Sequence, residues 1–426
     1  MSTFSTAIHF DRPFFANLAD WFAVAVAIAL PWSTSATGIL IAVWLVFVLA
    51  ALDPALIKRE LSTAAGALPA LLWCLAAVGM LWTDVSWVER FQGLGSFNRF
   101  LMIPLLLAQF RRSERGTYVI WGFFISSTIV LIVSFALVLA HMSTRPDKSI
   151  GIPVHDDIFQ NTEFLACSFG VLGIACDGFR RRHWAATLSL LAIAALFLVN
   201  MSVVIFSRIG LVVAPILLML LGWRWFRWKG VLGACVAAVL VSVFAWFGSS
   251  DFRFRLNESA LEVQEYLTRG AATSLGQHVE FLRESVSIIA TAPVIGHGTG
   301  SIPEQFRRVT AAESGAWAVA TRNPHNQTFA VAIQLGLIGA LVLWAMWIAH
   351  LHLFRGDSVI AWLGLVVVVQ NIVFSTVHSH LFDFASGWLY VFGVGVSGGM
   401  VLKEGSKQSM EPLSPEEPLA LTRQWI

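Results

Sequence analysis

Long apolar segments recur along the whole chain, and short polar connections separate them. A run of about twenty apolar residues is the length that an α-helix needs to cross the hydrocarbon core of a bilayer. The mean hydropathy is +0.72, and only 13% of the residues are charged, about half the fraction typical of soluble domains. The sequence therefore predicts an all-α polytopic membrane protein, with residues 1–426 forming a single membrane domain.

We expect about twelve transmembrane helices from the apolar runs. The first run has no cleavage-site pattern after it and is expected to be retained as a helix. The fourth is interrupted by Arg99 and Pro104, and the eighth is short. The predicted ranges are 14–31, 36–52, 63–82, 91–110, 118–141, 158–176, 184–206, 209–225, 230–248, 326–350, 358–377 and 384–402.

The distribution of basic residues predicts the orientation, because cytoplasmic connections retain Lys and Arg. Alternate connections carry most of them: Lys58 and Arg59, then Arg111, Arg112 and Arg115, then Arg180, Arg181 and Arg182, then Arg224, Arg227 and Lys229, and finally Arg355. This alternation predicts a cytoplasmic N-terminus. The polar loop between spans nine and ten, residues 249–325, then lies outside the cytoplasm, and the tail at 403–426, rich in Pro, Glu and Ser, is expected to be disordered and cytoplasmic.

The loop at 249–325 contains an amphipathic helical pattern. Its apolar stripe consists of Leu275, Val279, Leu282, Val286 and Ile289. Arg283 borders this stripe and can point toward the membrane, or it can pair with Glu280 in solvent. The pattern predicts a helix that lies over the bundle.

Arg208 separates two apolar runs at the non-cytoplasmic side of the bundle. A guanidinium at that boundary is costly unless it meets an anion, although it can also reach lipid phosphate. The tight connection between the two runs favours an anion inside the bundle.

Three glycines and a histidine near the end of the loop are further candidates for chemistry. Gly296, Gly298 and Gly300 permit positive backbone dihedrals, as a phosphate-binding nest requires. Pro324 is suited to the first position of a helix, which would place His325 in the opening turn of the next span. There the helix dipole favours an anion and disfavours imidazolium, leaving a neutral ring that can accept a proton.

Two clusters contain residue types that bind divalent metals. They are His155 with Asp156 and Asp157, and His378 with His380 and Asp383. Adjacent side chains usually point apart, so solvated turns are the favoured interpretation, and we predict no metal site. All four cysteines lie inside apolar runs, which argues against disulfides or a zinc knuckle. No phosphate-loop, dinucleotide or nucleic-acid-binding pattern is present in the sequence.

Taken together, these motifs resemble the O-antigen ligase and O-antigen polymerase superfamily of bacterial inner-membrane proteins. The resemblance rests on the Ser-Arg-Ile-Gly segment at 207–210, Arg283 on a loop helix, the Gly296–Gly300 turn, and His325 with Asn326 opening the next span. It implies a GT-C-like, inverting, metal-independent glycosyltransferase without a cofactor. The donor would be a glycan on undecaprenyl diphosphate, and for ligases the acceptor would be a lipid A-core sugar on the periplasmic face of a Gram-negative inner membrane.

The resemblance also implies roles for individual residues. Arg208 and Arg283 would hold the diphosphate and stabilise it as it leaves, and His325 would take the acceptor proton or orient that hydroxyl. Asn326, Gly296, Gly298, Gly300 and Arg322 are the remaining candidates for contacts with the diphosphate or glycan.

Three alternatives stay open. An O-antigen polymerase would use the same donor, and a protein-glycosylating member of the superfamily would usually carry a larger soluble extension. A secondary transporter or lipid flippase would place ionisable residues within the bilayer, for which Glu163 and Arg99 are the main candidates. We favour the ligase, because its branch combines one compact loop before span ten with this motif order.

Overall fold

The structure, a computed structural model, describes residues 11–144, 150–154, 157–204, 209–248, 250–312 and 321–408. Within these ranges the regular structure is entirely helical, which confirms the predicted fold class. The α-helices are α1 (Arg12–Ala29), α2 (Thr34–Ala50), α3 (Pro54–Leu61), α4 (Ala64–Gly79), α5 (Trp87–Asn98), α6 (Met102–Phe110), α7 (Gly116–Leu139), α8 (Asp157–Arg180), α9 (Trp184–Val203), α10 (Gly210–Gly248), α11 (Ser250–Arg269), α12 (Ser274–Thr291), α13 (Ile302–Val309), α14 (Gln327–Leu353), α15 (Val359–Phe374) and α16 (Phe384–Gln408).

Seven of the described helices, namely α1, α7, α8, α9, α10, α14 and α16, are long and apolar enough to cross a membrane. The pair α2 and α3, between which the chain bends by 110°, would make an eighth span, and α4 and α15 are apolar but shorter. Helical segments occupy all of the predicted ranges, while the count of about twelve spans stays a prediction. The last helix continues to Gln408, past the predicted start of the tail at Lys403; residues 409–426 lie outside the described ranges.

Many helices begin at a side chain that caps their free N–H groups. Ser33, Thr63 and Ser358 each accept a hydrogen bond from the backbone three residues further on. At the start of α5, Ser86 and Glu89 form a reciprocal capping box. These short polar residues therefore set the boundaries between apolar runs.

The helix α10 is a hairpin of two arms and not one straight rod. Its backbone leaves the helical conformation at Arg227, where φ is 54° and ψ is −142°. A Cβ atom at Gly230 would lie 2.1 Å from the carbonyl oxygen of Gly222, whereas eight residues of straight helix span about 12 Å. The arms correspond to the predicted eighth and ninth spans.

The helix α14 is also folded back, at Gly336, where φ is 62° and ψ is −162°. The indole of Trp344 donates to Thr328 Oγ1 at 3.2 Å, although sixteen residues of straight helix span about 24 Å. The first arm therefore lies beside the second, so the span predicted over 326–350 is helical but folds back within its length. Only glycine adopts such a turn without steric cost.

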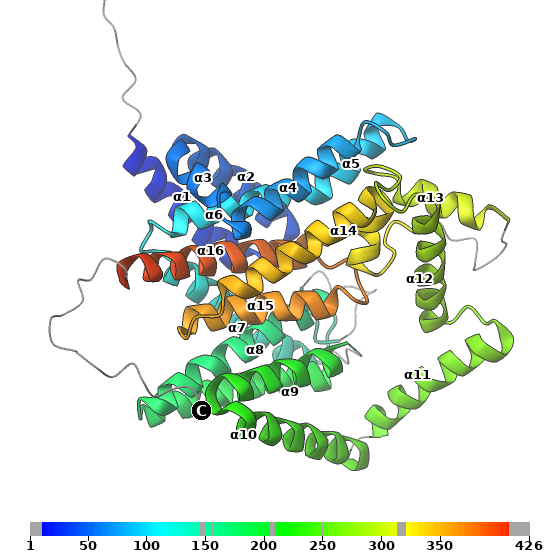
Figure 1. Ribbon diagram of the computed structural model, residues 1–426. Helices are drawn as coiled ribbons and strands as arrows, with labels where there is room; N and C mark the ends of the chain where they lie inside the picture. The colour runs from blue at the N-terminus through cyan, green and yellow to red at the C-terminus, as the bar shows by residue number, and fades with distance from the viewer. Residues whose placement is uncertain are drawn as a thin grey trace, which may run out of the picture.

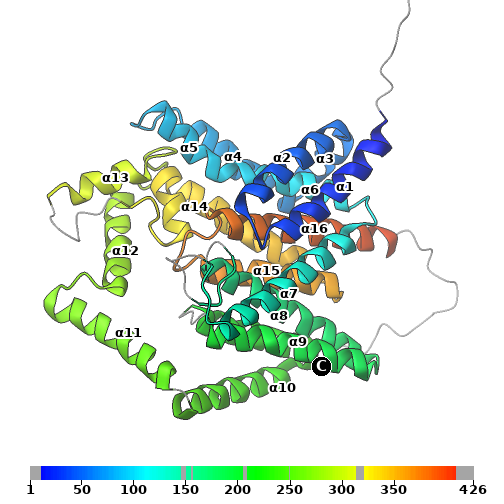
Figure 2. The same cartoon turned by 180° about the vertical axis from the view of Figure 1, so that it is seen from behind.

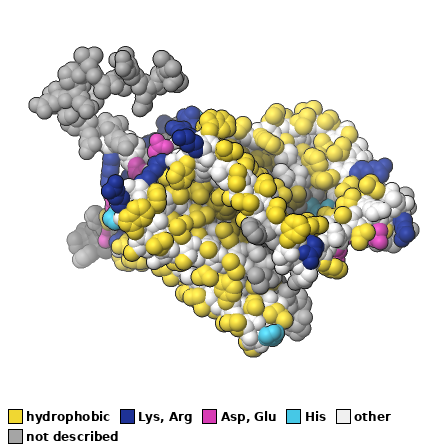
Figure 3. All heavy atoms as spheres, turned by 90° about the horizontal axis from the view of Figure 1, so that it is seen from below, with side chains coloured by type: hydrophobic (Ala, Val, Ile, Leu, Met, Phe, Trp, Pro, Cys, Tyr) yellow, Lys and Arg dark blue, Asp and Glu magenta, His cyan; other side chains and the backbone are white. Residues whose placement is uncertain are grey.

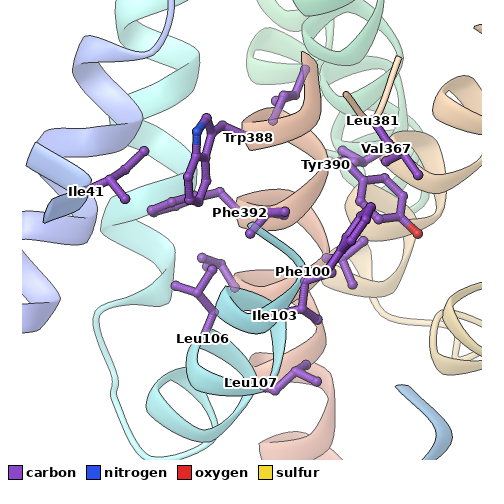
Figure 4. Packing of buried hydrophobic residues seen from close by; sticks show 14 of the residues in the cluster. Ile41, Phe100, Ile103, Leu106, Leu107, Val367, Leu381, Trp388, Tyr390 and Phe392 are labelled. Atoms are coloured by element: carbon purple, nitrogen blue, oxygen red, sulfur yellow. The ribbon is translucent and has the colours of Figure 1, made fainter. Parts of the chain in front are cut away.

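The apolar core follows two groups of helices. One group packs α1, α2, α4, α6, α14 and α16 together, and the other packs α7, α8, α9, the first arm of α10 and α15. Figure 4 shows Trp388 and Phe392 of α16 with Ile41 of α2 on one side and Leu106 of α6 close by. Figure 3 shows hydrophobic side chains over the middle of one face, with charged side chains toward its ends, as expected for a multi-pass membrane protein.

The loop helices form an arch at one end of the bundle (Figures 1 and 2). The second arm of α10 leads into α11, and α11 leads to α12, which runs across the helices of the bundle. The arch returns to the bundle where α12 packs against α13 and α14. Residues 249–325, predicted as a helical insertion, are helical wherever they are described as regular structure.

Candidate active site beneath the loop helices

The two halves of α12 have different surroundings. Its C-terminal half buries Glu284, Ser285 and Ile288, and Ile288 packs with apolar residues of α13 and of the first arm of α14. Val279 and Val286 are 46% and 55% exposed, so the predicted apolar stripe was wrong at these two positions. The stripe assumed one continuous buried face, but α12 contacts the bundle through only part of its length.

The N-terminal half of α12 forms one wall of a cavity of about 670 Å³. This wall consists of Leu275, His278 and Leu282, which recur at helical spacing. The wall from α11 contributes Arg255 and Glu258. The bundle wall is apolar apart from Asp157 and Thr376, and it includes Ile158, Ile209, Val212, Val373 and Val377. A molecule with an apolar chain and a charged group matches these walls.

His325 lines this cavity, in the short segment before α14. Its φ is 53°, a left-handed conformation that is uncommon for a residue with a side chain. The backbone N–H of His325 donates to Asn323 Oδ1 at 2.9 Å, which holds this turn. The cap of α14 is Asn326, so Pro324 does not begin the helix and His325 lies before its first turn. That part of the prediction was wrong because Asn326 is the stronger capping residue.

Three aromatic side chains surround the His325 imidazole. Phe281 stacks on it with centroids 5.7 Å apart, and His278 and His378 lie at 4.2 Å and 5.6 Å. Burial, together with the two neighbouring histidines, lowers the pKa of His325 to about 4. The ring is therefore neutral at physiological pH and has a nitrogen lone pair available, as a proton acceptor requires.

Arg283 lies on a different face of α12 from the cavity. Its side chain is 79% exposed, and its guanidinium lies 3.7 Å from Glu280 Oε1. Of the two orientations that the sequence left open for Arg283, the solvated pair with Glu280 is therefore the one found. Leu282, the preceding residue, does line the cavity.

Arg208 lies outside the described residues, as do His155 and Asp156. Ile209, which follows Arg208 in the chain, lines the cavity. Arg322 is exposed, two residues before the buried Pro324.

The glycine turn has the predicted backbone conformation but no free amide groups for a phosphate. Gly296, Gly298 and Gly300 all have positive φ. The amides of His297 and Gly298 donate to the carbonyls of Ile333 and Gln334, beside the fold of α14. Those of Gly296, Thr299 and Gly300 donate to Ala292 O, Gly79 O and Gln334 Oε1. The phosphate-nest interpretation was therefore wrong, because the amides of this turn hydrogen-bond to carbonyls of α14 that its fold leaves unpaired, and the turn packs on α4.

Asn326, also predicted to contact substrate, has two structural contacts. Its Oδ1 accepts from the Phe329 N–H, and its Nδ2 donates to the carbonyl of Thr376. It thus starts α14 and fastens that start to the segment after α15.

His380 of the second His and Asp cluster and the intramembrane charges Arg99 and Glu163 are all buried. No group of His, Cys, Asp and Glu suited to a metal ion occurs among the described residues. His380 is buried against Phe374 and Thr162. Arg99, at the break between α5 and α6, donates to the carbonyls of Phe382, Asp383 and Phe384. Glu163 is fully buried in α8.

The sequence indicated His325 but not its partners. His278 stands three residues after Leu275 and four before Leu282, so helical spacing alone could have placed it on the cavity wall. Phe281 and His378 could not have been found in this way, because tertiary packing brings them to the ring. Arg255 had no distinguishing signal in a loop helix with several charges.

The comparisons agree with the resemblance that the motifs suggested. Residues 193–344 match a family model described as O-Antigen ligase, and this range contains α10 to α13, the cavity wall from the loop and His325. A search of curated proteins gave no match. The match over residues 193–344, together with the helical membrane architecture, supports the resemblance of this chain to the O-antigen ligase superfamily.

Proposed function

We propose that this protein is an O-antigen ligase that transfers a glycan from undecaprenyl diphosphate to a hydroxyl of the lipid A core. The family match over residues 193–344 supports a membrane enzyme of the ligase and polymerase type. The observation that carries the proposal is the neutral His325 ring on the wall of a cavity that has an apolar side and a charged side. Ligand sites commonly have volumes of about 300 to 1,000 Å³, a range that includes this cavity.

The proposed reaction is a single displacement at the anomeric carbon of the donor. The acceptor oxygen forms a bond to that carbon as the bond to the diphosphate oxygen breaks, so the configuration inverts. The acceptor proton passes to a nitrogen of His325, and the bonding electrons leave with the diphosphate. Fixed cations near the departing group stabilise its growing negative charge, and this step then needs no metal ion.

The cations proposed for the diphosphate are Arg208, Arg255 and Arg283. Arg255 is the one that the structure supports directly, since it lines the cavity. Arg208 precedes the lining residue Ile209. Arg283 reaches the cavity only if its guanidinium leaves Glu280, and its role rests on the family resemblance alone.

The orientation of the protein follows from the same proposal. The basic connections lie in the cytoplasm of a Gram-negative bacterium, together with both termini, and the cavity faces the periplasm. The carrier enters from the outer leaflet of the inner membrane with its chain along the apolar wall formed by Val212, Val373 and Val377.

Reconstitution tests this function. Purified protein in liposomes receives carrier-linked glycan and lipid A-core, without an ion gradient and with or without a chelator. We expect a glycan–lipid A conjugate in both conditions, and a loss of about a hundredfold or more for His325→Ala. A full rate for that variant would refute the assigned role of His325.

The same assay separates the alternatives. Lengthening of the glycan with donor alone identifies a polymerase. Movement of the carrier without bond formation identifies a flippase, the class for which the buried Glu163 would be relevant. A conjugate that forms only when lipid A-core is present identifies the ligase.

A further inference from the structure

Asn323 connects the backbone of His325 with the ring of a second histidine. Its Oδ1 accepts the backbone N–H of His325 at 2.9 Å, and its Nδ2 lies 3.2 Å from His378 Nδ1. A backbone N–H can only donate, so this contact fixes which end of the amide is oxygen. The Nδ2 group is then a donor, and His378 Nδ1 must be its acceptor. The neutral His378 ring consequently carries its proton on Nε2.

We propose that Asn323 is a positioning residue that couples the strained turn at His325 to the protonation state of His378. The inference rests on the proposed function insofar as it concerns glycan transfer, while the coupling itself is a property of the free protein. His378 lies in the segment between α15 and α16, far from Asn323 in the sequence. Asn323 therefore joins the start of α14 to that segment beside the reacting histidine.

This coupling keeps a second positive charge away from His325. The ring centroids of His325 and His378 lie 5.6 Å apart. When His378 is neutral, His325 can accept a proton without a positive charge at that distance. The Asn323 amide donates to His378 Nδ1 and so opposes protonation of that nitrogen. A carboxylate at the same place would favour its protonation. Asn323 thereby sets both where the His325 ring points and how basic it is.

The other titratable groups around His378 come from three segments of the chain. Burial lowers the pKa of His378, Asp383 raises it, and His278 on α12 lowers it. His380 lies 6.0 Å from His378 between ring centroids, on the same connecting segment. His325 is the remaining neighbour, from the segment before α14. Any change of charge at position 323 acts on this group of histidines.

Two substitutions separate the functions of Asn323. Asn323→Asp keeps an oxygen for the His325 N–H but places a carboxylate oxygen against His378 Nδ1, which inverts the tautomer and raises the His378 pKa. Asn323→Ala removes both contacts. His352→Gln is the control, because His352 is exposed at the end of α14, where it contacts Arg355.

Histidine ¹⁵N NMR of the purified protein reads the coupling without any substrate. In the wild type, the ring signals that His378→Gln removes belong to His378, and we expect them to show its proton on Nε2. In Asn323→Asp its proton should move to Nδ1, and the pH at which it titrates should rise. An unchanged tautomer and titration in Asn323→Asp would overturn the inference, whether or not the protein transfers glycan.

The transfer assay then measures the consequence. Asn323→Asp and Asn323→Ala should lower kcat by between about tenfold and a hundredfold, the range expected for a misplaced reacting group, with the KM for donor within about twofold. The acid limb of kcat/KM should move to higher pH in Asn323→Asp only. Wild-type rates and pH dependence in Asn323→Asp would contradict the positioning role. A wild type that forms no conjugate would instead defeat the proposed function, and the NMR result would still decide the coupling.

Discussion

Gly336, at the fold of α14, is the position where a single methyl group should have the largest effect. A Cβ there would lie 2.2 Å from the carbonyl oxygen of Val294 and 2.3 Å from its carbon. Both atoms are backbone, so neither moves easily. The dihedrals, φ 62° and ψ −162°, belong to a region that only glycine adopts freely. Backbone strain of about 1 to 3 kcal/mol and overpacking of about 1 to 3 kcal/mol together predict that Gly336→Ala loses about 2 to 6 kcal/mol.

The loss should appear in function as well as in stability. The first arm of α14 begins two residues after His325, so a shifted fold displaces the imidazole from the cavity wall. A misplacement of about 1 Å typically costs about a hundredfold in rate. The measurements are thermal unfolding in detergent and glycan transfer in liposomes.

A matched glycine makes the comparison decisive. Gly233 lies in the second arm of α10, and a Cβ there would meet nothing within 4 Å. Gly233→Ala should leave transfer unchanged and stabilise the helix by about 0.5 to 1 kcal/mol. If Gly336→Ala unfolds at the same temperature as wild type and transfers glycan at the same rate, α14 does not fold back at Gly336.

Two further predictions concern charge at the site. Arg283→Ala should lower the transfer rate by about a hundredfold or more, the typical cost of removing one preorganised donor. Its unfolding temperature should change little, because exposed ion pairs contribute little to stability. An unchanged rate would confine Arg283 to its pair with Glu280, and Arg255→Ala, measured in parallel, would then identify the cation that acts. On the acid side, kcat/KM should fall only as the pH drops through about 4, because the pKa of His325 is lowered to about 4 and the ring stays neutral above that pH. An acid limb near pH 6.5 that His325→Ala abolishes would contradict a buried, neutral ring.

Several elements of the fold were predictable because they depend on local sequence. Apolar runs of membrane length and the polar residues that cap them located helices in every predicted range. The break at Arg99 was predictable from a charge inside an apolar run. The folds at Arg227 and Gly336 were harder to predict, because each helix segment on either side has an ordinary apolar composition. The turn at Gly336 depends on the 293–298 segment, whose amides and carbonyls pair with the opened backbone of α14.

The candidate site was predictable only where one residue carried a recognisable signal. His325 and Asn326 stand next to an apolar run, so their place near its start could be read from the sequence. The direction of Arg283 could not, because the same helical spacing allows a guanidinium on the border of an apolar face to turn either way. The glycine turn was conformationally as predicted, yet its amides serve the protein itself, which only the packing of α4 and α14 reveals.

The break between α5 and α6 has a consequence beyond its own helix. By ending one helix at Asn98 and starting the next at Met102, the chain turns Arg99 toward the carbonyls of residues 382–384. One planar guanidinium thus anchors the turn that follows His378, from a segment almost three hundred positions earlier in the chain. A continuous α-helix at this point would remove these hydrogen bonds. The break between α5 and α6 therefore helps to hold the segment after His378 in place beside the candidate site.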